Sequence, residues 1–297
     1  MLQFLVDALL RTADLALITL GLSMLYGLIK FPNIAHVQYA MCGAFLAYAL
    51  NSIGLPLVVA LVLASVLTGV LTLGVQLLVF DRLLKSGPAI AMIGSLAVSM
   101  VLVACVLGLA GSFPHMFSMP YTEPLVFGGA RISKTQLWFV ATTVVLLALF
   151  VLLLFHTQIG RAMRALACNP ALADASGLNA RRITNGVTLI SGMLAGLGGS
   201  MLALSTGAHV NLGYDLLLPV FAAAILGGLG NPLGAVAGAL LIALTETTVT
   251  NINFGPLFGE YLLFLPVSYI SAASFLILLL ALLFKPYGLF DREVRRV

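Results

Sequence analysis

Long apolar runs separated by short polar segments extend along the whole chain. A helix needs about 20 apolar residues to cross the hydrocarbon layer, and many of these runs approach or exceed that length. They lie at 8–29, 34–53, 55–80, 89–111, 135–155, 184–206, 215–229, 232–250 and 264–284. The run at 215–229 is short and ends in glycine, so it is either a full span or a half-helix. The pattern predicts an all-α polytopic membrane protein with about eight or nine transmembrane segments, including broken or re-entrant helices, in a single domain over 1–297.

The composition supports a membrane protein and excludes several other classes. Hydrophobic residues make up 61% of the chain, charged residues 8%, and the mean hydropathy is +1.14, which lies outside the range of soluble domains. The N-terminus has no basic region followed by a cleavage site, so the first run is expected to remain as a span. The three cysteines lack metal-ligand spacing, and we expect no metal site. A net charge of +4 reflects membrane topology and affinity for anionic lipid, and we expect no nucleic-acid partner.

One polar segment, 156–182, interrupts this apolar chain and reads HTQIGRAMRALACNPALADASGLNARR. Asn169 can cap a helix by accepting a bond from an early N–H, Pro170 suits the first helical position, and Gly177 can adopt the left-handed conformation that ends a helix. The enclosed helix is only about two turns long, so it needs a partner to be stable. We therefore interpret this segment, here called the island, as a docking element.

The island also carries the residues expected to contact that partner. Ala173 lies in the middle of the short helix and is expected on its docking surface, and the basic residues Arg161 and Arg164 flank the helix on its N-terminal side.

Cationic side chains gather in three regions: the short loop with Arg82 and Lys85, the island, and the tail that begins at Lys285. The positive-inside rule places all three in the cytoplasm, and with them the C-terminus. The segments 111–134 and 251–266 then lie outside, as solvated loops or as the docking site of an external partner. The N-terminus is outside if there are nine spans and inside if the first run contains extra crossings.

A break is predicted near residues 30–33. Pro32 lacks an N–H group and disfavours a helical conformation at Phe31. Polar side chains gather around it: Lys30, Asn33, His36 and Gln38. Polar residues at membrane depth often mark a pathway or a cavity, so Asn33 and His36 are candidates for lining a solute path. The alternative for His36 is that it braces neighbouring helices.

Glycines form a second candidate element. Gly230, Gly234 and Gly238 recur every four residues, which predicts one helix face that permits close backbone approach. This face either packs against another helix or, through Gly230 and Gly234, lines the solute path. The segment 227–244 also repeats the pattern of the first break, with glycines, an asparagine and then a small-residue helix, and such internal repeats are common in transporters.

Three acids within or beside apolar runs need an explanation. Glu246 has threonine neighbours near the end of a run, and we expect it to be partly exposed there. Asp215 precedes an apolar helix, where the helix dipole favours an acid. An ion-coupled secondary transporter would use such acids, Asp14 included, but would have no need of a docking helix in a basic loop.

The chain resembles the high-affinity branched-chain amino-acid ABC permeases of the LivH type over essentially its whole length. Three segments carry the resemblance: YGLIKFPNIAHVQYAMCGAFLAY, the island, and SGMLAGLGGSMLA followed by LPVFAAAILGGLGNPLGAVAGALLIALTE. The resemblance implies that the island is a cytoplasmic coupling loop. It further implies two ATP-binding cassette subunits, a second related permease subunit, a periplasmic or extracellular solute-binding protein, and the bacterial inner membrane.

This chain departs from the family pattern at one point. Such permeases usually have a glycine two to three residues beyond the Asn-x-Ala-His unit, whereas Val37 and Gln38 stand here. We expect this departure to affect how the helices pack at the break and which solute is carried.

The motif search argues against an enzyme. The chain has no G-x-x-x-x-G-K-[ST] phosphate loop, so we expect ATP to be hydrolysed by partner subunits, with no cofactor on this chain. No nucleophile stands at a recognisable spacing from His36 for an intramembrane hydrolase. The solute is left open among branched-chain amino acids, urea, short amides and aromatic acids.

Overall fold

The computed structural model describes residues 2–118, 124–127, 129–253, 269–284 and 288–289. The basic tail from Lys285 to the C-terminus, apart from 288–289, and most of the predicted outer segment 251–266 lie outside these residues. The proposed positions of those two parts therefore stay predictions.

The described chain is almost entirely helical, which confirms the all-α polytopic class. Six stretches are long and apolar enough to cross a membrane: α1 (Leu2–Ile29), the continuous stretch Leu57–Ser86, α5 (Pro88–Ala110), α6 (Lys134–His156), α9 (Ala180–Thr206) and α11 (Pro232–Asn251). The stretch Leu57–Ser86 comprises α3 (Leu57–Val75), the π-helix η1 (Gln76–Phe80), α4 (Asp81–Leu83) and the 3-10 turn η2 (Leu84–Ser86).

Shorter elements complete the described fold. The helices α2 (His36–Ser52), α10 (Leu212–Gly227) and α13 (Ile270–Phe284) have 17, 16 and 15 residues and correspond to the remaining predicted runs. Within the island lie α7 (Gln158–Cys168) and α8 (Pro170–Ala175). A small antiparallel hairpin pairs β1 (Leu125–Phe127) with β2 (Ala130–Ile132), with Val126 opposite Arg131.

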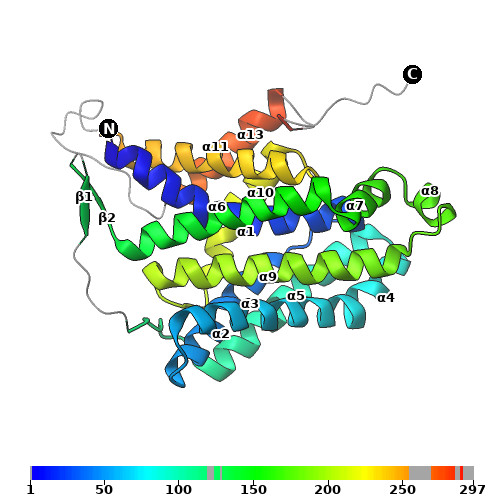
Figure 1. Ribbon diagram of the computed structural model, residues 1–297, viewed down its shortest axis with the longest axis horizontal. Helices are drawn as coiled ribbons and strands as arrows, with labels where there is room; N and C mark the ends of the chain where they lie inside the picture. Colours follow the sequence, from blue (N-terminus) through cyan, green and yellow to red (C-terminus); the bar gives the residue numbers. More distant parts are fainter. Residues whose placement is uncertain (1, 119–123, 128, 254–268, 285–287, 290–297) are drawn as a thin grey trace.

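The long helices lie side by side, with the hairpin at one end of the molecule and the island at the other (Figure 1). We call these the hairpin end and the island end. The backbone N–H of Arg131 donates to Gln3 Oε1 at 2.9 Å, so α1 begins at the hairpin end. At the island end, Arg181 and Asp81 form an ion pair at 3.5 Å between Nη2 and Oδ2. The basic loop after α3 and the island therefore share one side, as the charge pattern predicts, and the N-terminus lies on the other.

Helices α1 and α9 form the centre of the bundle. In their most apolar windows, 78% and 72% of residues are buried, against 22% in α5 and in α6, which places α5 and α6 on the outside of the described bundle. Helix α9 packs against α1, α2 and α3 through small residues. A Cβ on Gly199 would lie 2.1 Å from the carbonyl oxygen of Ala40, and one on Gly196 would lie 2.6 Å from Thr68 Cβ. The glycines of α9 therefore permit the close approach of the neighbouring helices.

Candidate functional site

The predicted break at Pro32 is confirmed. Helix α1 ends at Ile29, Lys30 takes the left-handed conformation with φ of 56°, and α2 begins at His36. The turn between them is fixed by side chains, because Asn33 Oδ1 accepts a bond from Ala35 N–H at 3.1 Å. Asn33 is buried, with 1% of its surface exposed.

His36 braces the start of α2 against the middle of α1. Its ring Nε2 lies 3.1 Å from the carbonyl oxygen of Ile18, and the side chain has no exposed surface. Its other ring nitrogen, Nδ1, has no hydrogen-bond partner among the described residues. The bracing contact exists in this conformation, and a role in lining a path stays a prediction.

Gln38 fills space left by a glycine on another helix. A Cβ on Gly213 of α10 would lie 2.1 Å from Gln38 Oε1. The side chain is 1% exposed, and neither amide atom has a partner in the described part of the chain. An unpaired buried polar group costs about 1–3 kcal/mol, so the contact between α2 and α10 carries this cost at Gln38.

The prediction that Gly230 belongs to a helical glycine face is wrong. Gly230 precedes α11, has φ of 89°, and lies against Gly27 near the end of α1. Gly234 does lie in α11, and a Cβ there would meet the carbonyl oxygen of Gly227 in α10 at 2.1 Å. The four-residue spacing joined a turn glycine to helical ones, so Gly230 and Gly234 face different neighbours.

Asn231 caps α11 and was not identified from the sequence. Its Oδ1 accepts a bond from Gly234 N–H at 3.1 Å, and Pro232 takes the first helical position. The sequence carries the same Asn-Pro signal that was recognised at Asn169 and Pro170.

The island contains the predicted capped helix. Asn169 Oδ1 accepts from Leu172 N–H at 3.1 Å, Pro170 opens α8, and Gly177 has φ of 81° where the helix closes. The N–H of Leu178 also donates to the carbonyl oxygen of Ala173 at 3.1 Å. The local geometry thus matches the prediction, and its role in coupling stays a prediction.

The two arginines at the start of the island lie in different environments. Arg164 donates from Nη1 to the carbonyl oxygen of Leu154 at 2.7 Å and lies over the Phe155 ring, so it fastens α7 to the end of α6. Arg161 is exposed. Met163, on the buried face of α7, packs in one cluster with Met24 of α1. The island is therefore fixed to both α1 and α6.

Ala173 does not lie on the exposed surface of α8, contrary to the prediction. It is 3% exposed, whereas its neighbour Leu172 is 64% exposed. Helical spacing alone could not show which side of so short a helix would turn inward. Leu172 is the large apolar side chain that α8 exposes.

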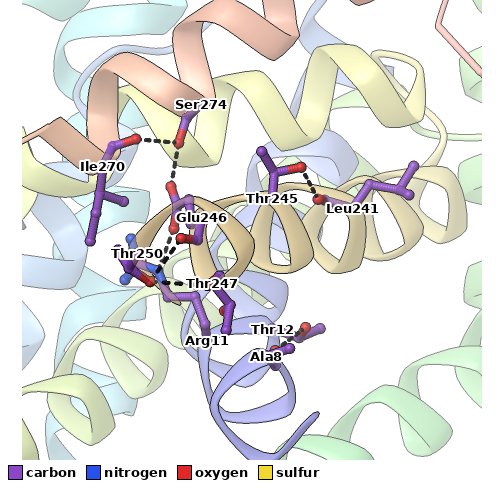
Figure 2. Close-up of polar contacts among 10 residues, drawn as sticks. All are labelled: Ala8, Arg11, Thr12, Leu241, Thr245, Glu246, Thr247, Thr250, Ile270 and Ser274. Carbon is purple, nitrogen blue, oxygen red and sulfur yellow. Dashed lines mark hydrogen bonds and ion pairs between the residues drawn. The ribbon is translucent and has the colours of Figure 1, made fainter. Parts of the chain in front are cut away.

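Glu246 is also placed differently from the prediction of partial exposure. It is 2% exposed, and its Oε2 accepts a bond from Arg11 Nε at 2.6 Å. Its other oxygen accepts a bond from Ser274 Oγ of α13, which also approaches the carbonyl oxygen of Ile270 (Figure 2). This ion pair joins α1, α11 and α13, and both oxygens of the carboxylate are used.

Asp14 and Asp215 differ in their surroundings. Asp215 lies in the first turn of α10, as predicted for an acid favoured by the helix dipole, and its Oδ2 is 3.1 Å from His209 Nε2. Asp14 borders a cavity of about 360 Å³ that also contacts Arg11 and Glu246. The sequence marked both acids as unusual, but it could not show that Asp14 shares a cavity with a cation.

The chain was compared with known families, curated proteins and solved structures. It matches the family described as "Branched-chain amino acid transport system / permease component" over residues 4–284. It is 30% identical to the probable branched-chain amino acid transport permease protein LivH of Methanocaldococcus jannaschii, over 93% of this chain and 88% of the relative. It is 29% identical to BraD of Pseudomonas aeruginosa, a high-affinity branched-chain amino acid transport system permease protein, over 100% and 98%.

A further relative and one solved structure are also similar to this chain. LivH of Escherichia coli K12 is 28% identical over 95% of this chain and 93% of the relative. The structure of PsaBC from Streptococcus pneumoniae in complex with Fab has a TM-score of 0.51 at 12% identity, covering 94% of this chain and 91% of that one. At that identity the structural likeness concerns the fold alone.

The helical bundle and these relatives define a multi-pass membrane permease of a transport system. The chain belongs to the family of permease components of branched-chain amino acid transport systems.

Proposed function

We propose that this chain is the permease subunit of an ATP-binding cassette importer for branched-chain amino acids in the bacterial inner membrane. It forms the translocation path with a second, related permease subunit. Two separate ATP-binding subunits hydrolyse ATP, and an external solute-binding protein delivers the solute. The island end and the C-terminus face the cytoplasm. Membership of the family supports the solute class, since the relatives named above are branched-chain amino acid permeases.

One observation carries the coupling part of this proposal: α8 presents an exposed leucine on a short capped helix that is fixed to the bundle. Leu172 is 64% exposed beside the buried Ala173. Met163 of α7 packs against α1 and α6, so a force applied to the island reaches the two helices directly. Helix α1 in turn ends at the break that holds Asn33 and His36. The arrangement supports transmission of a movement of the ATP-binding subunits to the break.

Substitution of Leu172 by Glu tests the docking assignment. The side chain is exposed, so the variant should insert and fold, while the charge should remove the apolar contact with the ATP-binding subunits. We expect loss of co-purification of these subunits and of ATP-dependent uptake of leucine. Leu109→Glu is the matched control, because Leu109 is 90% exposed at the hairpin end of α5. If Leu172→Glu assembles and transports like the control, α8 is not the docking helix.

The sequence alone suggests Ala173→Arg as the test of docking. In the structure this substitution tests the folding of the island instead. Ala173 is buried, so a large charged side chain there should disrupt the island itself. A loss of transport in that variant would not separate docking from misfolding, and Leu172→Glu is the informative change.

A further inference from the structure

The Arg11–Glu246 pair leaves part of the guanidinium without a protein partner. Arg11 uses Nε to reach Glu246, and its two terminal nitrogens make no hydrogen bond in the described structure. Its side chain is 27% exposed, whereas that of Glu246 is 2% exposed. Glu246 is occupied by Arg11 and Ser274, so it fixes the guanidinium in place. The two terminal nitrogens are arranged so that they can donate two parallel hydrogen bonds to one carboxylate.

An acid without a hydrogen-bond partner lies beside these donors. Asp14 follows Arg11 by three positions on α1, so the two side chains stand about 5–6 Å apart on one face of the helix. Among the described residues no donor binds the Asp14 carboxylate. Both side chains border the cavity of about 360 Å³, whose wall also includes the acids Asp7 and Glu246, the polar residues Thr247, Thr250 and Asn251, and the apolar residues Leu10 and Ile270. Asp7 accepts a bond from Gln3 and Glu246 is paired with Arg11, which leaves Asp14 as the acid of this wall without a described donor.

This cavity lies near the start of the α1 span, and its polar groups require a polar neighbour. Arg11 lies three residues inside the apolar run predicted at 8–29, about 5 Å along the helix axis at a rise of 1.5 Å per residue. Ionised side chains at such depth face a water-filled path or another protein, because lipid cannot solvate them. A water-filled opening or the second permease subunit at the side formed by α1, α11 and α13 would satisfy the groups that the Arg11–Glu246 pair leaves over.

We propose that this cavity binds the charged backbone of a free α-amino acid, with the carboxylate on the terminal nitrogens of Arg11 and the ammonium on Asp14. The apolar side chain of the solute then lies toward Leu10 and Ile270. The inference rests on the proposed function and deepens it. The cavity is near the hairpin end, which is the external side in the proposed orientation, so an imported solute reaches it early.

The same chemistry discriminates among the solutes that the sequence left open. Urea and short amides carry neither charge, and an aromatic acid without an amino group leaves Asp14 without a partner. A branched-chain amino acid supplies both charges and an aliphatic group for the apolar wall. The cavity thus selects amino acids as a class, and the external binding protein selects among them.

Binding is measured by calorimetric titration of the assembled permease–ATPase complex in nanodiscs without the solute-binding protein. The ligands are leucine, leucinamide, which lacks the carboxylate, and 4-methylpentanoate, which lacks the ammonium. We expect leucine to bind. Each analogue should bind at least about tenfold more weakly than leucine, since each loses one charge-assisted contact. Absence of leucine binding, or equal binding of either analogue, overturns the proposal.

Two variants assign the two charges, and a third is the control. Asp14→Asn should weaken leucine binding and abolish its advantage over 4-methylpentanoate. Arg11→Lys keeps the charge near Glu246 but lacks the paired donors, and should reduce the advantage over leucinamide. Thr12→Val is the control, because the Thr12 hydroxyl donates to the Ala8 carbonyl oxygen of its own helix. Unchanged leucine binding in Asp14→Asn would overturn the assignment.

Uptake by the wild-type complex separates this inference from the proposed function. If vesicles with the complete transporter fail to accumulate leucine with ATP, the proposed function is wrong. If they accumulate leucine and the Asp14→Asn complex has the same KM and binding as wild type, only the cavity assignment is wrong.

Discussion

At the scale of single residues, Glu246 illustrates why partners distant in the chain escape sequence analysis. Its neighbours are threonines, which predicted a polar and partly exposed position. Its actual partners, Arg11 and Ser274, are 235 and 28 positions away. Nothing local marks such a pairing, because the ionised carboxylate is stabilised by the fold and not by its own helix. By contrast, Pro32 and Asn169 act on their own backbone, and both effects were predicted.

The pair should respond unequally to removal of its two members. Arg11→Gln leaves the carboxylate of Glu246 charged and 2% exposed, whereas Glu246→Gln leaves a guanidinium that is 27% exposed and partly solvated. Breaking a buried pair costs about 3–5 kcal/mol, and we expect Arg11→Gln to approach that range and Glu246→Gln to fall below it. Thermal unfolding in detergent shows which of the two variants is less stable.

The double variant supplies the control for this prediction. Arg11→Gln with Glu246→Gln removes the isolated charge, so it should be more stable than Arg11→Gln alone. Equal unfolding temperatures for the two would show that the charge of Glu246 is not the cause of the loss.

The break at Pro32 allows a second residue-scale test. Asn33 and His36 are 1% and 0% exposed, so cysteines placed there should be inert to small thiol reagents in this conformation. If the two residues border the path, we expect labelling to increase in one nucleotide state of the assembled transporter. The three native cysteines are replaced first. Inertness in every state would leave His36 as a brace between α2 and α1.

At the scale of elements, helix starts were predictable where the cap was looked for. Asn169 with Pro170 and Asn231 with Pro232 carry the same signal, and the structure caps α8 and α11 in the same way. Periodicity was less informative, because it grouped Gly230 with the helical glycines. A glycine in a turn and a glycine on a helix face cannot be distinguished in the sequence, and only the backbone conformation shows which is which.

The α10–α11 contact depends on Gly234. A Cβ there would lie 2.1 Å from the Gly227 carbonyl oxygen, so Gly234→Leu should force the helices apart and cost about 1–3 kcal/mol or more. Lipid offers little drive to restore the lost packing. Leu240→Ala is the comparison, since Leu240 is 40% exposed. We expect a clearly lower aggregation temperature for the glycine variant, and equal temperatures would mean that this contact contributes little.

At the scale of the whole molecule, charge and length placed the elements on two sides, and the structure agrees within the described residues. The basic loop after α3 lies beside the start of α9 through Arg181 and Asp81, while the hairpin lies beside the start of α1. The sequence could not predict which helices lie next to one another in the bundle, because the local sequence of an apolar helix does not indicate its neighbours. The sides of the island and the N-terminus with respect to the cell follow only from the positive-inside rule.

Labelling of single cysteines in a cysteine-free chain tests that orientation. Ser112→Cys lies at the hairpin end and Ala175→Cys lies in the island, and both positions are exposed. An impermeant maleimide should label Ser112→Cys in intact cells and Ala175→Cys only after the membrane is opened. The reverse pattern would invert the proposed orientation while leaving the fold unchanged.

The central position of α9 has a consequence for biosynthesis. Helices α2 and α3 pack their small and hydroxyl-bearing faces on α9, yet α9 begins at Ala180, roughly 100 residues after α3 ends at Val75. At a translation rate of about 5–20 residues per second, this gap lasts roughly 5–20 s. During that time the threonines of α3 and the small residues Ala40 and Gly43 of α2 are in the membrane without their final neighbour. We therefore expect a chain truncated before Ala180 to keep these faces uncovered and to be degraded faster in the membrane than the full chain.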